Sequence, residues 1–150
     1  MSGKERRDRY LLVRSGGRSY GVSTRHVRHV VRGLPYHPVP GGQPHLLGLA
    51  QYGGEPLAVL DIDALLQHAR PRSSYRSTVV LGRRGRRSRI MIGLAVDEAR
   101  RVERLPGAIE ATAGGPYVSG TVDVDGEPVQ ILDASVLLED RNPDDRGKNG

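Results

Sequence analysis

Residues 44–66 read PHLLGLAQYGGEPLAVLDIDALL, and residues 116–138 repeat the same design as PYVSGTVDVDGEPVQILDASVLL. A repeat of this length is too long for a solenoid unit and indicates two copies of one small subdomain. Such a chain typically offers a surface between its copies rather than a reaction centre. The identical pairs, all 72 residues apart, are Pro44/Pro116, Gly48/Gly120, Gly54/Gly126, Glu55/Glu127, Pro56/Pro128, Leu60/Leu132, Asp61/Asp133, Leu65/Leu137 and Leu66/Leu138.

Upstream of this block, each copy carries the pattern of a β-hairpin. Tyr10–Val13 is apolar, Arg18–Val22 alternates between polar and apolar residues, and Ser15-Gly16-Gly17 separates them. Glycine supplies the positive φ that a tight turn requires. In the second copy, Thr78–Leu81 and Arg89–Val96 flank an Arg-rich turn in the same way.

Spaced valines follow the first hairpin at Val27 and Val30. Ser23 or Thr24 is suited to cap one helical turn before Val27, since both side chains can accept a backbone N–H bond. Proline blocks the continuation of regular structure and biases the residue before it toward extended geometry. The valine-bearing segments are therefore expected to end at Leu34-Pro35 and Leu105-Pro106.

The repeated block itself predicts a second hairpin in each copy, closed by Gly53-Gly54 and by Asp125-Gly126. Asp-Gly is a strong signal for a two-residue turn. Asp61 and Asp133, which precede short Leu-Leu segments, are predicted to be N-caps of helical turns. The expected strands are Leu46–Tyr52 and Leu57–Leu60 in the first copy, and Val118–Val124 and Val129–Leu132 in the second.

These patterns predict a mainly β fold with about five strands in each half, arranged as two small β-barrels that leave no exposed sheet edges. We expect a flexible N-terminus over residues 1–9, one domain of two subdomains over 10–138, with a linker at residues 70–74, and a disordered tail over 139–150. No stretch resembles a signal peptide or approaches the ~20 apolar residues that span a bilayer. A soluble, cytoplasmic protein is expected.

The composition predicts an aliphatic core. A chain of 150 residues buries roughly 68–70% of its unfolded surface, so it folds without a metal or disulfide. Phe and Trp are absent, and each of the six Tyr brings a hydroxyl that needs a partner when buried. The absence of Cys excludes disulfides, thiolate metal sites and a Cys nucleophile.

The formal net charge is +6, with a pI of about 10.2. A basic excess is compatible with nucleic acid, anionic lipid or an acidic protein as partner, although Arg-rich composition also follows from a GC-rich genome. The strongest local charge is Arg83–Arg89. Single-strand nucleic-acid binding also uses aromatic platforms, and this segment has none. A solvated hairpin tip is favoured, then an acidic protein partner, and lastly a small basic nucleic-acid-binding barrel.

Reactive chemistry is not indicated. The histidines cluster at His26, His29, His37 and His45, but their spacing matches no common zinc pattern and the second copy lacks them. An enzyme using this cluster is the weakest alternative. The aspartate pairs Asp61/Asp63 and Asp123/Asp125 fall at a cap and a turn, where Asp serves local hydrogen bonding. No nucleophile elbow or phosphate-binding glycine motif occurs. We therefore expect a noncatalytic protein without metal or cofactor.

The chain resembles CheW-like domains, the coupling proteins of bacterial chemosensory arrays and the matching regulatory domain of their histidine kinases. The resemblance spans about Tyr10 to Leu138 in order and spacing. It implies two intertwined five-stranded SH3-like β-barrels. The motifs that carry it are Tyr20-Gly21-Val22, Val27-x-x-Val30, Leu47-Gly48 through Gly54 to Val59-Leu60-Asp61, Gly93-Leu94-x-Val96-Asp97, Leu105-Pro106 and Gly120 to Leu138.

The family implies an adaptor that bridges the cytoplasmic tip of a methyl-accepting chemoreceptor to the regulatory domain of a CheA-type histidine kinase. The receptor would dock in a hydrophobic groove between subdomains, and the kinase domain would meet the barrel ends. No nucleic acid partner and no membrane insertion are implied. The matching receptor-groove positions are Val27, His29, Val30, Gln51, Tyr52 and Gly53.

Several positions depart from the family pattern. Gly53 replaces an Arg, and His29 replaces a residue that is often acidic. Without that Arg the turn lacks a guanidinium group, whose several hydrogen-bond donors glycine cannot supply. The segment Ile109–Gly120 is shorter than usual, and no helix is expected after Leu138. One of the two interfaces is therefore expected to be altered.

Overall fold

The computed structural model describes residues 8–66, 75–83, 90–105, 109–111 and 115–139. The expected linker at residues 70–74, most of the expected N-terminal segment and tail, and the basic run after Arg83 lie outside these residues. The first copy forms β1 (Arg9–Ser15), β2 (Arg18–Ser23), β3 (Val27–Arg32), β4 (Leu46–Tyr52), β5 (Glu55–Asp61) and α2 (Ile62–Leu65). The second forms β6 (Ser77–Gly82), β7 (Met91–Val96), β8 (Glu98–Arg104), β9 (Val118–Val124), β10 (Glu127–Leu132) and α3 (Ala134–Glu139).

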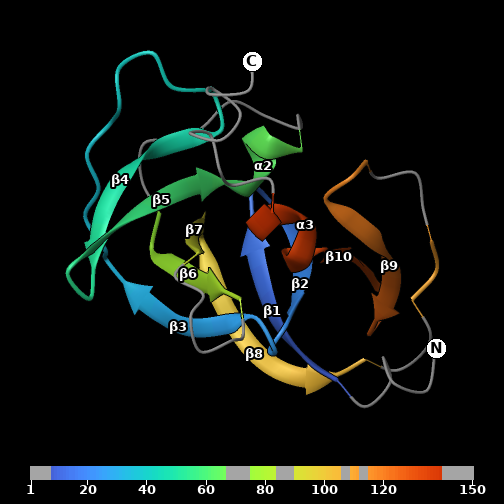
Figure 1. Cartoon of the computed structure of the whole chain (residues 1–150). Coiled ribbons are helices and arrows are strands. Elements are labelled where there is room, and N and C mark those ends of the chain that lie inside the picture. The colour runs from blue at the N-terminus through green and yellow to red at the C-terminus, as the bar shows by residue number, and fades with distance from the viewer. Residues whose placement is uncertain (1–7, 67–74, 84–89, 106–108, 112–114, 140–150) are drawn as a thin grey trace.

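The strands form two five-stranded sheets, and each sheet takes strands from both copies (Figure 1). Lobe A has the order β8-β1-β2-β10-β9, and lobe B has the order β3-β6-β7-β5-β4. In each lobe the copies meet at a parallel pair, β2 with β10 in lobe A and β5 with β7 in lobe B, and at an antiparallel pair, β1 with β8 and β3 with β6. The mainly β, intertwined SH3-like fold is confirmed. The lobes are open sheets with edge strands rather than fully closed barrels.

The two-residue turns adopt the backbone that their sequences predict. Gly53 and Gly54 have φ of 59° and 82°, and Asp125 and Gly126 have φ of 53° and 81°. Positive φ at both central residues defines the type I′ turn, whose twist matches that of the flanking strands. The hairpins predicted from the repeat are therefore confirmed.

The predicted helix caps are also confirmed. Asp61 Oδ1 accepts a hydrogen bond from Ala64 N at 3.2 Å, and Asp133 Oδ1 accepts one from Val136 N at 3.1 Å. Each carboxylate thereby satisfies a backbone donor that has no partner within its helix.

The repeated pair Gly48 and Gly120 marks places where a second chain segment crosses the strand. A Cβ on Gly48 would lie 2.2 Å from the carbonyl oxygen of His37, and a Cβ on Gly120 would lie 2.3 Å from that of Glu110. Backbone hydrogen bonds hold each crossing, between His37 and Leu49 and between Glu110 and Thr121. Only a residue without a side chain fits this approach.

The segment with spaced valines is a strand that ends shortly before Leu34-Pro35. A single turn does close before it, with His26 N donating to Ser23 O at 3.1 Å, but Val27 and Val30 lie in strand β3. The two valines face the same side of the strand although they are three residues apart, because a β-bulge lies between them. Val27 pairs with Leu81 and His29 with Val80, which leaves Arg28 as the extra residue.

The main core lies between the lobes and is aliphatic, as predicted. It contains residues of both sheets, among them Val13 and Val22 from lobe A and Val79 and Leu94 from lobe B. Smaller cores fill each lobe, one around Val129 and one around Leu57. Because the central core is shared, the two lobes form one packed body.

Candidate partner-binding site

The predicted receptor positions on β3 divide between two faces of the strand. Val27 and Val30 are half-buried and pack against the central core. Their strand partners Leu81 and Val79 are members of that core, whereas His29 lies opposite Val80 of the lobe B core. The bulge at Arg28 therefore places both valines beside the junction of the lobes and turns His29 toward lobe B.

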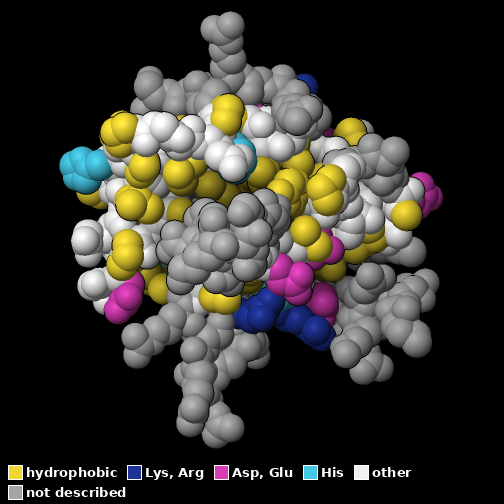
Figure 2. Space-filling view, turned by 45° about the horizontal axis from the view of Figure 1, so that its top comes forward, with side chains coloured by type: hydrophobic (Ala, Val, Ile, Leu, Met, Phe, Trp, Pro, Cys, Tyr) yellow, Lys and Arg dark blue, Asp and Glu magenta, His cyan; other side chains and the backbone are white. Residues whose placement is uncertain are grey.

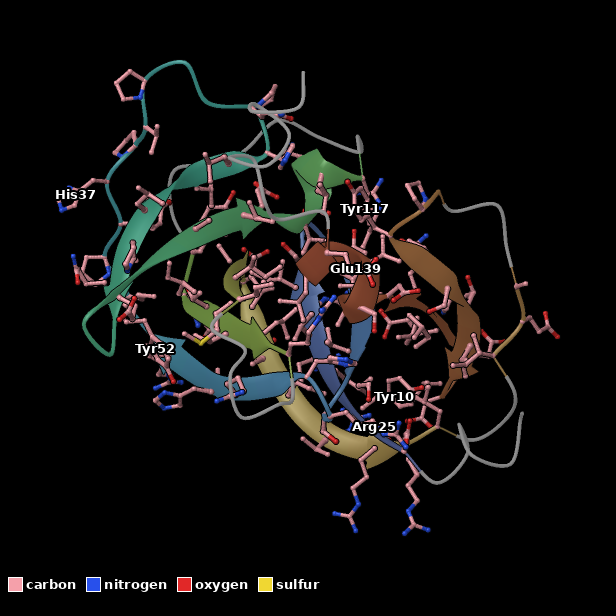
Figure 3. The ribbon with its side chains drawn as sticks, viewed as in Figure 1. Tyr10, Arg25, His37, Tyr52, Tyr117 and Glu139 are labelled. Carbon is pink, nitrogen blue, oxygen red and sulfur yellow. The ribbon has the colours of Figure 1, made fainter. Side chains whose placement is uncertain are left out.

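The predicted positions on β4 lie at the opposite edge of the same sheet, yet one of them reaches β3. Tyr52 Oη and His29 Nδ1 are 3.3 Å apart, and the ring centroids are 5.9 Å apart. Figure 3 shows Tyr52 where the end of β4 approaches β3. This contact joins the two edge strands of lobe B through side chains. Gly53 lies in the adjoining turn, where an added Cβ would meet no atom within 4 Å.

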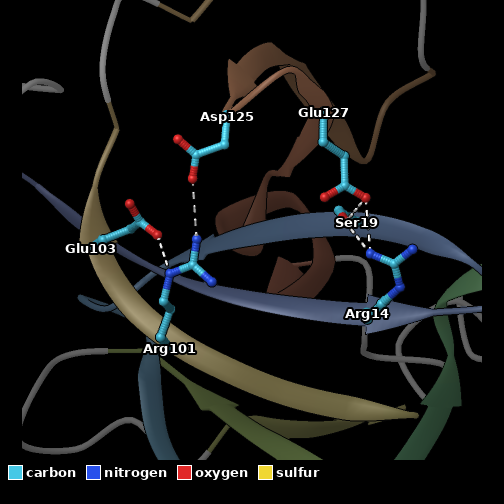
Figure 4. Close-up of polar contacts among 6 residues, drawn as sticks. All are labelled: Arg14, Ser19, Arg101, Glu103, Asp125 and Glu127. Carbon is cyan, nitrogen blue, oxygen red and sulfur yellow. Dashed lines mark hydrogen bonds and ion pairs between the residues drawn. The ribbon is translucent and has the colours of Figure 1, made fainter.

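An equivalent contact joins the edges of lobe A with different chemistry. Arg101 occupies the position of His29 and Asp125 that of Gly53 at the 72-residue offset, and their side chains form an ion pair of 3.7 Å. Arg101 also contacts Glu103 (Figure 4). The duplicated fold thus bridges the edges of one lobe with an aromatic pair and those of the other with an ion pair.

A polar network extends the charged side of lobe A. Glu127 accepts hydrogen bonds from Ser19 Oγ at 2.8 Å and from Arg14 at 2.9 Å (Figure 4). The hydrogen bond from Ser19, followed by that from Arg14, lowers the pKa of Glu127. These groups are engaged with one another, so this part of lobe A is polar and internally neutralised.

The remaining predicted position, Gln51, belongs to an apolar cavity of about 390 Å³. The loop after β3 crosses β4 through the His37–Leu49 bridge and forms one wall. Leu49 and Val39 are 44% and 37% exposed. In Figure 2, which turns this end of the molecule forward, hydrophobic side chains gather across the face. The cavity is lined by Pro35, His37, Pro38, Val39, Pro40, Leu49, Ala50, Gln51 and Pro56.

One buried polar pair was not recognised from the sequence. Tyr20 of β2 donates to Asp63 of α2 at 2.8 Å, and the two residues are 0% and 1% exposed. Burial, and then the hydrogen bond to Asp63, raises the pKa of Tyr20. The sequence context of Asp63 predicts local hydrogen bonding near the helix cap, but its side chain connects helix α2, which follows lobe B, to the sheet of lobe A. The backbone at Gly16 also lies against it, because a Cβ there would be 2.1 Å from Asp63 Oδ2.

The four clustered histidines take part in separate contacts. His26 Nε2 is 3.5 Å from Ser135 Oγ, and His29 meets Tyr52. His37 bridges to Leu49 through its backbone, and the His45 carbonyl accepts from Asp61 N at 2.9 Å. Within the described ranges, no three His, Asp or Glu side chains form a group that could hold a metal ion. No helix in that part of the chain is long and apolar enough to cross a membrane.

The fold defines a class: β proteins of two intertwined SH3-like lobes that pack around a shared core. A family model described as the CheW-like domain matches residues 9–142, and the chain belongs to this family of chemotaxis scaffold and adaptor domains. The chain is also similar to the crystal structure of the scaffolding protein TtCheW from Thermoanaerobacter tengcongensis, at 17% identity and a TM-score of 0.70, with 84% of each chain covered. No curated protein sequence gives a significant match.

Proposed function

We propose that this chain is a noncatalytic adaptor that couples a methyl-accepting chemoreceptor to a CheA-type histidine kinase in a chemosensory pathway. The observation that supports this proposal is the half-buried pair Val27 and Val30, which lies on edge strand β3 beside the junction of the lobes. Partly exposed apolar residues beside a core are suited to act as anchors for a partner. Receptor docking is assigned to this surface.

An adaptor also needs a second surface that stays accessible when the first is occupied. The cavity between the proline-rich loop and β4 fits this need, because exposed Leu49 and Val39 border it. Its lining is mostly apolar and contains four prolines. Prolines restrict the backbone, so an apolar side chain of a partner could enter the cavity with little cost for ordering the loop. We assign the regulatory domain of the kinase to this cavity.

Two variants of the purified protein test the two assignments separately. Val27→Asp should abolish capture of a receptor tip fragment and leave kinase binding intact, because it places a charge on the β3 surface only. Val39→Asp should abolish kinase binding and leave capture of the receptor tip fragment intact. Circular dichroism confirms that both variants fold. Unchanged receptor capture by folded Val27→Asp protein would remove the receptor assignment, and unchanged kinase binding by Val39→Asp would remove the kinase assignment.

A further inference from the structure

A second cavity, of about 440 Å³, lies on lobe A and shares no residue with the surfaces assigned above to the receptor and the kinase. Its volume is within the range of ligand pockets, roughly 300–1,000 Å³. It combines charged, amide and hydroxyl side chains with one proline ring, so a polar occupant with a short apolar part suits it. The residues that line it include Arg18, Ser19, Thr121, Glu127, Pro128 and Gln130.

The strands of lobe A bring these side chains together. Alternate residues of a strand share a face, so Arg18 lies on the side of Tyr20, and Pro128 lies on the side of Gln130. Gln130 stands beside Tyr20 in the parallel pair of β10 with β2, and beside Thr121 in the antiparallel pair of β10 with β9. Since β2 belongs to the first copy and β9 and β10 to the second, the cavity lies where the two copies meet.

The equivalent positions in lobe B line a cavity of different character. At the 72-residue offset, Thr121 corresponds to Leu49 and Pro128 to Pro56. Leu49 and Pro56 both line the apolar cavity of lobe B. The duplicated hairpin thus presents leucine in one lobe and threonine in the other, and the cavity of lobe A is the polar counterpart.

Two side chains of the lobe A cavity have hydrogen-bond donors that are not engaged. Arg18 is exposed and Gln130 is half-buried, and neither side chain forms a hydrogen bond or ion pair with any residue that the structure describes. A guanidinium group presents its donors in a planar arrangement that matches a carboxylate, and an amide adds further donors. Arg18 and Gln130 are therefore suited to hold a carboxylate together.

Glu127 contributes an acceptor to the same cavity. Its Oε2 accepts hydrogen bonds from Ser19 Oγ at 2.8 Å and from Arg14 at 2.9 Å, and Ser19 is 7% exposed (Figure 4). The bond from Ser19, and then that from Arg14, lowers the pKa of Glu127, which keeps it ionised at neutral pH. Its Oε1 accepts no hydrogen bond from the described residues. An ionised carboxylate only accepts, so a ligand must bring a donor to this oxygen.

The balance of charge indicates the class of ligand. Glu127 and Arg14 form an ion pair and offset each other, which leaves the positive charge of Arg18 at the cavity. We propose that this cavity binds a small hydroxycarboxylate with a single negative charge. The carboxylate pairs with Arg18 and Gln130, the hydroxyl donates to Oε1 of Glu127, and the short carbon chain packs on Pro128.

Titrations followed by two-dimensional amide NMR test this proposal, because they detect weak binding and locate it on the chain. The probes are γ-hydroxybutyrate, butyrate without the hydroxyl, γ-aminobutyrate with an ammonium in its place, and butylamine without the carboxylate. γ-Hydroxybutyrate should bind about fivefold more tightly than butyrate, as expected for one added hydrogen bond. Glycolate with acetate, and a six-carbon hydroxy acid with its parent acid, extend the comparison to shorter and longer ligands.

Substitutions of Arg18 test which group holds the carboxylate. Arg18→Gln should weaken γ-hydroxybutyrate binding about fivefold, because it removes one partly solvated ion pair. Arg18→Glu should reverse the charge preference, so that butylamine binds more tightly than butyrate. The matched control is Arg32→Gln, which removes an exposed arginine of lobe B that also has no partner among the described residues, and which should bind as wild type does.

Saturable shifts confined to the lining residues, with the hydroxy acid preferred and that preference dependent on Arg18, would support the proposal. The absence of saturation by about 20 mM of every hydroxy acid would overturn it. Equal binding of each hydroxy acid and its parent acid, or equal weakening by Arg18→Gln and Arg32→Gln, would overturn it as well. Tighter binding of γ-aminobutyrate would refute the charge balance and with it the monoanionic class.

This inference does not depend on the proposed adaptor role. Val27→Asp and Val39→Asp test the receptor and kinase assignments on β3 and on lobe B, away from the lobe A cavity. Failure of either assignment leaves the predicted NMR shifts unchanged, and failure of the ligand titrations leaves the adaptor assignments unchanged.

Discussion

Replacing Tyr20 by Phe tests the buried link between α2 and the sheet of lobe A. The substitution removes the hydroxyl that donates to Asp63 at 2.8 Å and leaves a carboxylate that is 1% exposed with one donor fewer. Loss of a buried hydrogen bond to a charged group costs about 2 kcal/mol. For a chain of this size, that corresponds to a fall in Tm of about 4–8 °C.

Urea unfolding at pH 7, monitored by circular dichroism, measures this change. The midpoint should fall while the m-value stays constant, since the same surface is exposed on unfolding. Tyr52→Phe is the matched control, because its hydroxyl contact with His29 is exposed and its loss should cost less than about 0.5 kcal/mol. Equal stability of Tyr20→Phe and wild type would refute the assignment of the pair as a stabilising link.

The same pair predicts a response to alkaline pH. Burial raises the pKa of Tyr20 above its ordinary value of 10.0, so the folded state favours the neutral phenol. The contribution of this group to stability is fully present below about pH 10, and it is lost as pH rises further because only the unfolded chain ionises there. Wild type should lose stability above pH 10 more steeply than Tyr20→Phe, and parallel curves would contradict this.

Further predictions concern two glycines. Gly120→Ala should lower stability by about 2 kcal/mol, since its Cβ would displace the segment that exchanges two backbone hydrogen bonds between Glu110 and Thr121. Asp123→Ala on the same strand is the exposed control, and a loss of equal size there would contradict the steric argument. Gly53→Arg should lower the free energy of unfolding by about 1–2 kcal/mol, because φ is 59° there. The same substitution should strengthen receptor capture, because it restores the guanidinium group that the family resemblance implies at this turn. Weaker capture by the folded variant would show that this turn does not contact the receptor.

Local features of the fold were predictable because they depend on neighbouring residues. The bounds expected for strands Leu46–Tyr52 and Val118–Val124 agree with β4 and β9. The glycine turns and the Asp61 and Asp133 caps follow from backbone conformations and hydrogen bonds that lie within a few residues. The Gly48 and Gly120 crossings appear in the sequence only as repeated glycines, because the segments that they meet lie elsewhere in the chain.

Features that depend on long-range pairing were not readable from local pattern. The bulge at Arg28 gives Val27 and Val30 a helix-like spacing within a strand. Asp63 has the sequence context of a helix cap, and its partner Tyr20 lies 43 residues away. Among the six predicted site residues, His29 and Tyr52 form a side-chain contact that joins the two edge strands of lobe B, and residues 23 positions apart cannot be paired from local pattern. The roles of all six in binding stay predictions.

The exchange of strands between the copies has a consequence for how the chain acquires its shape. Neither lobe can be completed from one half of the sequence, since lobe A needs β8, β9 and β10 and lobe B needs β6 and β7. A nascent chain that ends before Ser77 would therefore display unpaired strand edges and half of a shared interior. Synthesis must pass Val96 before lobe B has all its strands and Leu132 before lobe A does, so truncation of the gene after the first copy cannot yield a complete lobe.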